Sequence, residues 1–240
     1  DPEALLAAIE RHRVTATLVA PPMLERLLDH PGLDGADTAS LRTVVYGAAG
    51  LGRERLARAH ERFGPVLCRV YGRTEAPNQI AVLTPGDHAE ALASGDPARL
   101  ASCGRPVTIA DVRLVDDDLD DVPAGEPGEI AVQGPHVMLG YWRRPEETAA
   151  TLRSGWLRTG DVARADERGF LYLVDRKADM IVSGGASVFP REVEDALLGH
   201  DAVRDACVIG VPDPRRGEAV KAYVVAGEGA AVDEAELIAW

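Results

Sequence analysis

The sequence predicts an α/β protein built from three consecutive parts, and three observations support this division. Over residues 1–104, apolar strand patterns alternate with amphipathic helix patterns, which is typical of a parallel sheet. Over residues 105–174, short strand patterns alternate with turn signals, which indicates a small β-rich subdomain. Over residues 175–240, strands and helices mix again. We therefore expect part of a large parallel-sheet domain, then the subdomain, then a partial α+β C-terminal domain.

The first part is expected to place a ligand-binding edge at the ends of its strands. An apolar, β-branched run such as residues 14–20 is typical of a buried strand, and the proline pair at 21–22 starts a helix. Ligands of parallel sheets bind beyond the carboxyl ends of the strands, where the loops 47–50 and 72–75 follow. The predicted elements are helices over 1–13, from 21 and over 53–63, and strands over 14–20, 41–46 and 65–71.

The second part is expected to hold strands over 111–115, 128–133 and 170–174, with a short helix over 145–152. Between the first two strands lies the acidic run 116–121. It lacks the glycine and glutamate of a calcium-binding loop, so a solvated hairpin tip is a better interpretation than a metal site.

The third part is predicted to begin after residue 177. It is expected to contain a strand over 180–183, a proline-started helix over 190–198 and strands over 203–211 and 219–225. A last helix is expected to begin at residue 233.

Composition excludes several classes of protein. A net charge of −13 repels phosphate backbones, so no nucleic acid partner is expected. No run approaches the roughly 20 apolar residues that a membrane span needs, and no signal-peptide pattern is found. Cys68, Cys103 and Cys207 form no CxxC pair, which argues against a zinc site and favours reduced thiols in the cytoplasm. The six histidines have no cysteine or carboxylate at ligand spacing.

The pentapeptide YGRTE at residues 71–75 combines three groups that suit a nucleotide. An aromatic ring can lie on a purine, a hydroxyl can bond a phosphate oxygen, and a carboxylate can hold Mg²⁺. An ordinary strand end, with a glycine turn and a helix cap, is the structural alternative for the same residues.

The longest informative stretch runs from residue 155 to 194. It places an isolated acid, Asp161, after a Thr-Gly turn, and then a strand, a charged joint at 175–177 and the glycine pair Gly184-Gly185. Turn, strand, joint and glycine loop in that order indicate a ligand site that crosses a domain boundary. A capping aspartate, a surface arginine and a plain turn are the structural alternatives.

The motifs YGRTE, GWLRTGDVA, DRKADMIVSGG and SGGASVFPREVE closely resemble the acyl-CoA synthetase branch of the adenylate-forming (AMP-binding) enzyme superfamily. The resemblance covers nearly the whole chain. It implies that a carboxylic acid, fatty or aromatic, reacts with ATP to give an acyl-adenylate and pyrophosphate. The thiol of coenzyme A then attacks the adenylate after a C-terminal lid has rotated. ATP or AMP, Mg²⁺ and CoA are the implied cofactors and co-substrates.

The resemblance also assigns roles to individual residues. Thr74 and Glu75 are expected to be catalytic, with Glu75 as the ligand of Mg²⁺. Asp161 is expected to accept both ribose hydroxyls, which suits a carboxylate that only accepts hydrogen bonds. Arg176 is expected to contact the ribose and phosphate side. The other expected nucleotide-binding residues are Gly47, Ala48, Ala49, Tyr71 and Gly72.

The resemblance places the lid at residues 175–240 and its hinge near Ala178. Gly184 and Gly185 are expected to line the pantetheine tunnel, because residues without side chains let a thin chain pass close to the backbone. Two positions depart from the family pattern: family members more often carry Asp, Lys or Ser at Ala178, and Asn at Ser187.

Two elements of the family pattern have no counterpart here, namely a lysine-bearing Ser/Thr/Gly-rich phosphate loop and a late Thr-Gly-Lys. The two lysines, Lys177 and Lys221, lie in other contexts. Losing one such electrostatic contact typically lowers the rate about 10²–10³-fold, so we expect this chain alone to show no measurable ligase turnover. We also expect self-association through apolar surface exposed near Asp1. The alternatives are a non-catalytic AMP-binding remnant or interaction module, and a carrier-protein-linked adenylation domain, which YGRTE in place of YGPTE disfavours.

Overall fold

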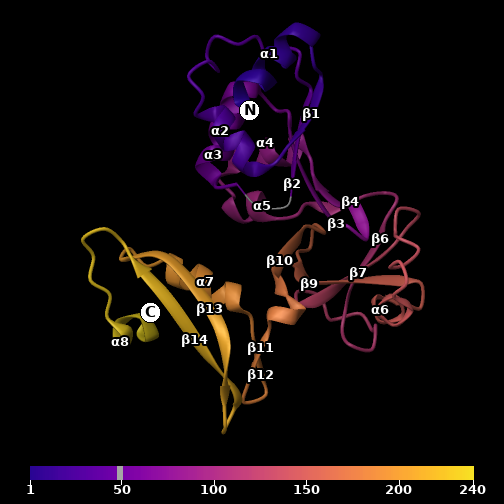
Figure 1. Cartoon of the computed structure of the whole chain (residues 1–240), viewed down its shortest axis with the longest axis vertical. Coiled ribbons are helices and arrows are strands. Elements are labelled where there is room, and N and C mark those ends of the chain that lie inside the picture. The colour runs from indigo at the N-terminus through magenta and orange to yellow at the C-terminus, as the bar shows by residue number, and fades with distance from the viewer. Residues whose placement is uncertain (48–50) are drawn as a thin grey trace.

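Three sheets follow one another along the chain in the computed structural model (Figure 1), which describes residues 1–47 and 51–240 apart from the side chains of Asn78 and Gln79. The first sheet draws its strands from residues 16–106, the second from 111–176 and the third from 181–226. The α/β fold class predicted from the sequence is confirmed. No helix among the described residues is long and apolar enough to cross a membrane.

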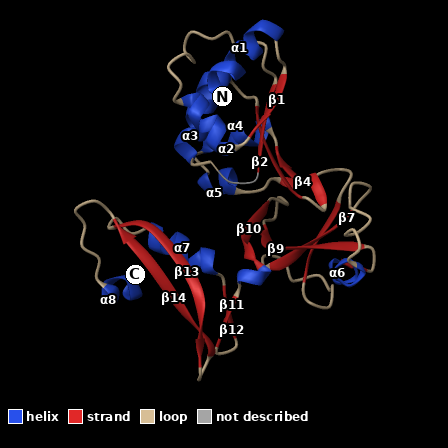
Figure 2. Ribbon diagram, in the orientation of Figure 1, coloured by secondary structure: helices blue, strands red, loops and turns tan. Residues whose placement is uncertain are grey.

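The first sheet has the order β1-β2-β3-β4-β5 and carries its helices alongside (Figure 2). Its first three strands pair in parallel, as the alternation of strands and helices predicts. Each of these strands is preceded or followed by a helix that begins with proline or ends near glycine. The elements are α1 (Pro2–His12), β1 (Ala16–Val19), α2 (Pro21–Leu28), β2 (Thr43–Gly47), α3 (Arg53–Phe63), β3 (Leu67–Arg73), β4 (Ala76–Leu83), α4 (Pro85–Ser94), α5 (Pro97–Ala101) and β5 (Arg105–Pro106).

One part of the prediction for this sheet is wrong. The residues 72–75 do not form a loop: β3 continues to Arg73, and Thr74-Glu75 is the short connection to the antiparallel strand β4. The sequence analysis did not predict β4. Its first half, APNQ, is polar and contains a proline, so it lacks the apolar alternation of a strand.

The second sheet is antiparallel, with the order β10-β9-β7-β6 and β8 paired to β9. Asp161 was expected after a turn, but it lies inside the ten-residue strand β9. The Thr-Gly pair before it is a bulge, where Gly160 has φ of 74° and the register between β7 and β9 shifts. The elements are β6 (Asp111–Val115), β7 (Gly128–Gln133), α6 (Pro145–Thr151), β8 (Leu152–Arg153), β9 (Trp156–Ala165) and β10 (Leu171–Arg176).

The third sheet has the order β12-β11-β14-β13 and lies apart from the first sheet in Figure 1. A single 3₁₀ turn, η1, joins it to the second sheet. The predicted strands and helices of this part are present, and one strand, β12, was missed. The elements are η1 (Lys177–Asp179), β11 (Ile181–Ser183), β12 (Ala186–Val188), α7 (Pro190–Leu198), β13 (Val203–Asp213), β14 (Gly217–Ala226) and α8 (Glu234–Ala239).

The first two sheets share one apolar core. Tyr71 and Ile80 of the first sheet pack in the same buried cluster as Ile130, Leu157 and Leu171 of the second. Full burial of such a side chain stabilises a fold by about 1.5–3 kcal/mol. This shared core therefore holds the end of β3 against β9, which is where the candidate site is built.

At the opposite edge of the first sheet, β1 has no neighbour among the described strands beyond β2. Its Leu18 side chain is 65% exposed. An exposed apolar edge is the feature from which self-association was expected, and self-association stays a prediction.

Candidate nucleotide-binding site

Asp161 is the centre of the candidate site. Its carboxylate is almost completely buried, and the Tyr71 hydroxyl donates to its Oδ2 over 2.7 Å. Arg73 Nη1 donates to its Oδ1 over 3.1 Å. Arg176 stands opposite Asp161 in the pairing of β10 with β9, with its Nε 4.0 Å from Oδ1. Residues predicted from separate motifs thus meet at one carboxylate.

The local sequence around Asp161 explains this geometry. The backbone N–H of Asp161 donates to Thr159 Oγ1 over 3.1 Å, and that hydroxyl donates to the carbonyl of Ile130 over 2.8 Å. The Gly160 bulge and the threonine bridge therefore fix the orientation of the carboxylate. Burial, together with the charge of Asp161, raises the pKa of Tyr71, so the phenol stays protonated and acts as a donor.

Glu75 is held by a second tyrosine. The Tyr141 hydroxyl donates to Glu75 Oε1 over 2.6 Å, and Arg73 Nε lies 3.8 Å from Oε2. The hydrogen bond from Tyr141 is the main reason that the pKa of Glu75 lies below its ordinary value. An ionised carboxylate with free lone pairs fits Mg²⁺, which proteins often bind through one or two carboxylates plus substrate phosphates. Thr74, next to it, is exposed and has its hydroxyl available for a phosphate oxygen.

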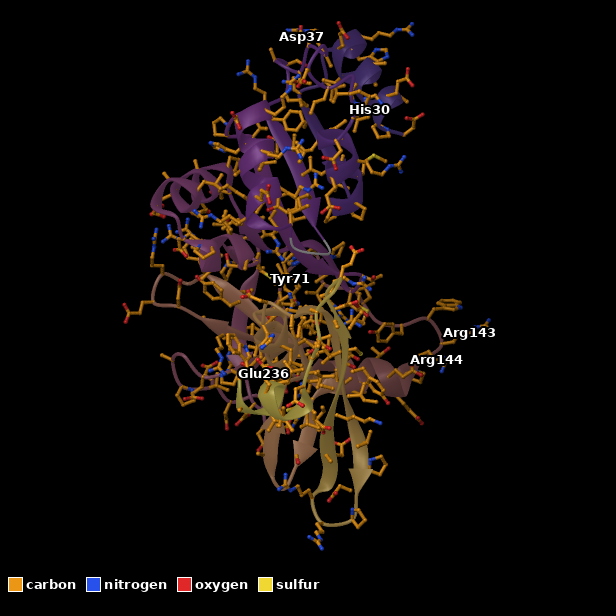
Figure 3. The ribbon with its side chains drawn as sticks, turned by 90° about the vertical axis from the view of Figure 1, so that its left-hand side faces the viewer. His30, Asp37, Tyr71, Arg143, Arg144 and Glu236 are labelled. Carbon is orange, nitrogen blue, oxygen red and sulfur yellow. The ribbon has the colours of Figure 1, made fainter. Side chains whose placement is uncertain are left out.

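A cleft of about 580 Å³ lies between the end of β3 and the strand pair β9–β10, and Asp161, Glu75 and Thr74 line it. In Figure 3, Tyr71 lies at the level where the N-terminal part of the chain meets the rest of the molecule. Four arginines and several carboxylates share the walls, so the cleft offers donors for phosphate and acceptors for hydroxyl groups. The predicted residues found here are Tyr71, Gly72, Thr74, Glu75, Asp161 and Arg176, and the arginines are Arg69, Arg73, Arg176 and Arg191.

Gly47 ends β2, and its lack of a side chain has a structural reason. A Cβ at this position would lie 2.8 Å from the carbonyl oxygen of Val70 in the adjacent strand. The close approach of β3 thus requires glycine here, independently of any adenine ring. The expected adenine contacts Ala48 and Ala49 lie outside the described residues.

Gly184 and Gly185 are not part of the cleft. They form the two-residue turn between β11 and β12, with φ of 61° and 88°, rather than the strand-to-helix loop expected from the sequence. Positive φ at both positions is what such a hairpin turn demands of its residues, and glycine meets it without strain. The structure therefore places this pair in the C-terminal unit, outside the cleft around Asp161.

Several residues of the cleft were missed by the sequence analysis. Arg69 and Arg73 lie two positions on either side of Tyr71 in β3, and both line the cleft. Alternate residues of a strand point to one face, so this spacing was a usable signal. Cys103 also lines the cleft, and burial raises its thiol pKa to about 11. Tyr141 holds Glu75 from outside this cleft, and it gave no local signal because the two residues are 66 positions apart.

The acidic run between β6 and β7 is exposed, as expected of a hairpin tip, but it is not merely solvated. Asp117 forms an ion pair with Lys177 and accepts from Arg158 over 3.3 Å. Among the described residues, no group of three His, Cys, Asp or Glu side chains could hold a metal ion by itself.

Comparison with known proteins places this geometry in a family. The chain is 51% identical to a medium/long-chain-fatty-acid–CoA ligase of Mycobacterium tuberculosis, over 98% of this chain and 40% of the ligase. The structure of the amide bond synthetase McbA from Marinactinospora thermotolerans superposes with a TM-score of 0.82 and 47% identity, over 100% of this chain and 47% of McbA. The o-succinylbenzoate coenzyme A synthetase of Bacillus subtilis, in complex with ATP and magnesium, superposes with a TM-score of 0.77 and 33% identity, over 100% of this chain and 47% of that enzyme.

Two family models match separate parts of the chain. The model of the AMP-binding enzyme matches residues 1–142, which is more than half of the chain, and the model of the AMP-binding enzyme C-terminal domain matches residues 192–240. The chain spans less than half the length of each relative named above. The resemblance seen in the sequence motifs is confirmed: the chain belongs to the AMP-binding enzyme family.

Proposed function

We propose that this protein acts as an ATP-dependent carboxylic acid–CoA ligase, and that the cleft around Asp161 holds the nucleotide of its acyl-adenylate. One observation carries the proposal: a buried carboxylate lies in a cleft with one hydrogen bond on each oxygen. Each carboxylate oxygen has two lone-pair sites, so each can accept one ribose hydroxyl as well. Tyr71 and Arg73 hold the two oxygens in place before the ribose arrives.

The charged residues around Asp161 support a phosphate next to the ribose. Arg73 and Arg176 both place guanidinium donors near Oδ1 of Asp161, and arginine binds phosphate oxygens through parallel N–H donors. Glu75 and Thr74 lie at the same end of β3. Mg²⁺ held there would neutralise phosphate charge, while this chain's own residues orient the nucleotide.

We propose that coenzyme A is the acyl acceptor and that the unit after Lys177 is the lid. The ligases of Mycobacterium tuberculosis and Bacillus subtilis named above use CoA by name, whereas McbA is an amide bond synthetase. In this structure Gly184 and Gly185 lie outside the cleft, and a rotation at Ala178 is the movement that would bring them to it. The carboxylic acid is a fatty or aromatic acid in this proposal.

The nucleotide site can be tested directly on this chain. Titration calorimetry with AMP should show binding that Asp161→Asn weakens about tenfold or more, because hydrogen bonds to a charged group contribute about 1.5–3 kcal/mol each. The matched control is Asp34→Asn, since Asp34 is an exposed carboxylate far from the cleft in the chain. Equal AMP affinity in wild type and Asp161→Asn would contradict the proposed ribose site.

The reaction itself needs a second assay. A longer protein that contains this chain, a lysine-bearing phosphate loop and a late Thr-Gly-Lys is incubated with ATP, Mg²⁺, a medium-chain fatty acid or an aromatic acid, and either CoA or an amine, and products are identified by mass spectrometry. An acyl-CoA product supports the proposal, and an amide without acyl-CoA would favour an amide-forming relative of McbA. This chain alone is expected to show no turnover, and a longer protein that binds AMP but forms no acyl-adenylate would support the non-catalytic alternative.

A further inference from the structure

Glu129 is a buried carboxylate that the proposed chemistry does not use. It lies on β7, is 5% exposed and is absent from the residues that line the cleft around Asp161. Its Oε1 accepts from the backbone N–H of Gly160 over 3.0 Å. Its Oε2 accepts from Arg158 Nε over 3.0 Å and from Lys177 Nζ over 3.1 Å. One carboxylate therefore binds three residues, two of them on β9 and the third in the joint.

The two segments that matter most adjoin the candidate site. Gly160 immediately precedes Asp161, and Lys177 immediately follows Arg176. Asp161 and Arg176 are themselves paired residues of β9 and β10. Glu129 thus binds the residue next to Asp161 and the residue next to Arg176. The second of these, Lys177, lies where β10 ends and the joint begins.

Charge explains why Lys177 stays at this position. Burial alone would raise the pKa of Glu129, but hydrogen bonds from Arg158 and Lys177 outweigh it and hold the pKa below its ordinary value. Lys177 also pairs with the exposed Asp117. Removing a partner from a buried ion pair is strongly destabilising, so the ammonium is held in this conformation.

We propose that Glu129 is a positioning residue that couples the ribose-side carboxylate Asp161 to the start of the lid joint, because it binds Gly160 and Lys177 at the same time. This inference rests on the proposed function for the role of Asp161. A shift of Lys177 away from Glu129 removes one of the cations that neutralise this carboxylate. It also loosens the Gly160 bulge that fixes the orientation of Asp161. By reciprocity, a nucleotide bound at Asp161 strengthens the hold on Lys177.

The lysine content of the chain supplies a specific readout. Endoproteinase Lys-C can cut only after Lys177 or Lys221, because these are the two lysines. Lys177 lies in the joint, and cleavage there requires the joint to open locally. Lys221 lies on β14 of the lid and reports on the lid alone.

The first variant is Glu129→Gln, which keeps the shape but removes the charge. We expect cleavage after Lys177 to become at least tenfold faster while cleavage after Lys221 is unchanged. We also expect AMP to bind about fivefold to tenfold more weakly, and saturating AMP to protect Lys177 in the wild type but not in Glu129→Gln. In Lys177→Arg the cleavage site is absent, so the fragment that disappears is the one produced by cleavage after Lys177.

The matched control is Asp117→Asn, since Asp117 contacts Lys177 and Arg158 but not Gly160. Glu129 still binds both Gly160 and Lys177 in this variant, so cleavage after Lys177 should speed up less than in Glu129→Gln, and AMP affinity should fall by less than twofold. Equal loss of AMP affinity in both variants, or equal acceleration of cleavage at both lysines, would overturn the coupling through Glu129. If the wild type does not bind AMP, the proposed function fails on its own, and unchanged cleavage after Lys177 in Glu129→Gln would still overturn the hold on the joint.

Discussion

The junction between the first and second sheets differs from the junction between the second sheet and the C-terminal unit in what crosses it. Across the first junction run a shared apolar core, hydrogen bonds from Tyr71 and Arg73 to Asp161, and backbone bonds such as Cys103 N to the carbonyl of Leu171 at 2.7 Å. These contacts are buried and redundant. The end of β3 and the strand β9, which carry Tyr71 and Asp161, are therefore held in one relative geometry.

The second junction contains fewer buried contacts than the first. Its apolar cluster consists of Val162, Val174 and Phe189, with Met180 packed against it. The Arg191 backbone N–H donates to Asp175 Oδ2 over 3.0 Å at the start of α7. Few buried contacts mean a low cost of local opening. The part of the candidate site that lies between the first two sheets is therefore preformed, whereas residues of the C-terminal unit reach it only in some positions of that unit.

The largest effect is expected from removing a side chain at the first junction. Leu157 is fully buried in the core that the two sheets share. Leu157→Ala should lower the free energy of unfolding by about 2–5 kcal/mol, because a cavity is left as well as lost apolar burial. Denaturant unfolding measured by circular dichroism checks the value.

Leu139→Ala is the matched control, because Leu139 is fully exposed and should change the stability by no more than about 0.5 kcal/mol. AMP binding should weaken in Leu157→Ala together with stability. A Leu157→Ala variant that unfolds like the wild type would show that the two sheets do not depend on a common core.

A smaller and local effect is expected at the second junction. Phe189 is 7% exposed and makes up much of the small cluster there. Phe189→Ala should accelerate amide hydrogen exchange in β11–β14 by about tenfold or more, while exchange in β7 and β9 stays at the wild-type rate. AMP affinity should change less than twofold.

Val182→Ala is the control for this variant, since Val182 is on β11 but half-exposed and outside the cluster. If Phe189→Ala speeds exchange in β9 as much as in β13, the two junctions are one cooperative unit and the contrast between them is wrong.

The sequence could predict elements that depend on local patterns, but not contacts between distant segments. Strands and helices with strong local patterns, such as 53–63 and 128–133, were predicted with the bounds that the structure has. Asp161 and Arg176 were found through motifs, but their pairing across β9 and β10 was not. Pairing is a long-range property that no local pattern encodes.

Other parts of the site could not be predicted for the same physical reason. Glu129 reads as an ordinary strand residue in GEIAVQ, and its three partners come from β9 and η1. The hairpin turn at Gly184 was mistaken for a loop because β12 is only three residues long. A short strand gives too few alternating positions to be seen in the sequence.

The smallest expected effect is a difference between the two junctions in the reactivity of their cysteine thiols. Cys103 lies in the core of the first junction, and Cys207 is exposed on β13 of the C-terminal unit. Burial raises the pKa of Cys103 to about 11, so at pH 8 roughly one molecule in a thousand carries the reactive thiolate. Iodoacetamide at pH 8 should therefore modify Cys207 within minutes and leave Cys103 intact for hours, as peptide mass spectrometry would show.

Reaction at Cys103 should rise about tenfold for each pH unit below its pKa, because only the thiolate attacks. Cys68 is half-buried and also free, so the double variant Cys68→Ser/Cys207→Ser isolates this slow phase. If the first junction is as closed as its contacts indicate, Leu157→Ala should speed the labelling of Cys103 and Phe189→Ala should not. Labelling of Cys103 that follows Phe189→Ala instead would mean that opening of the C-terminal unit also opens the core between the first two sheets.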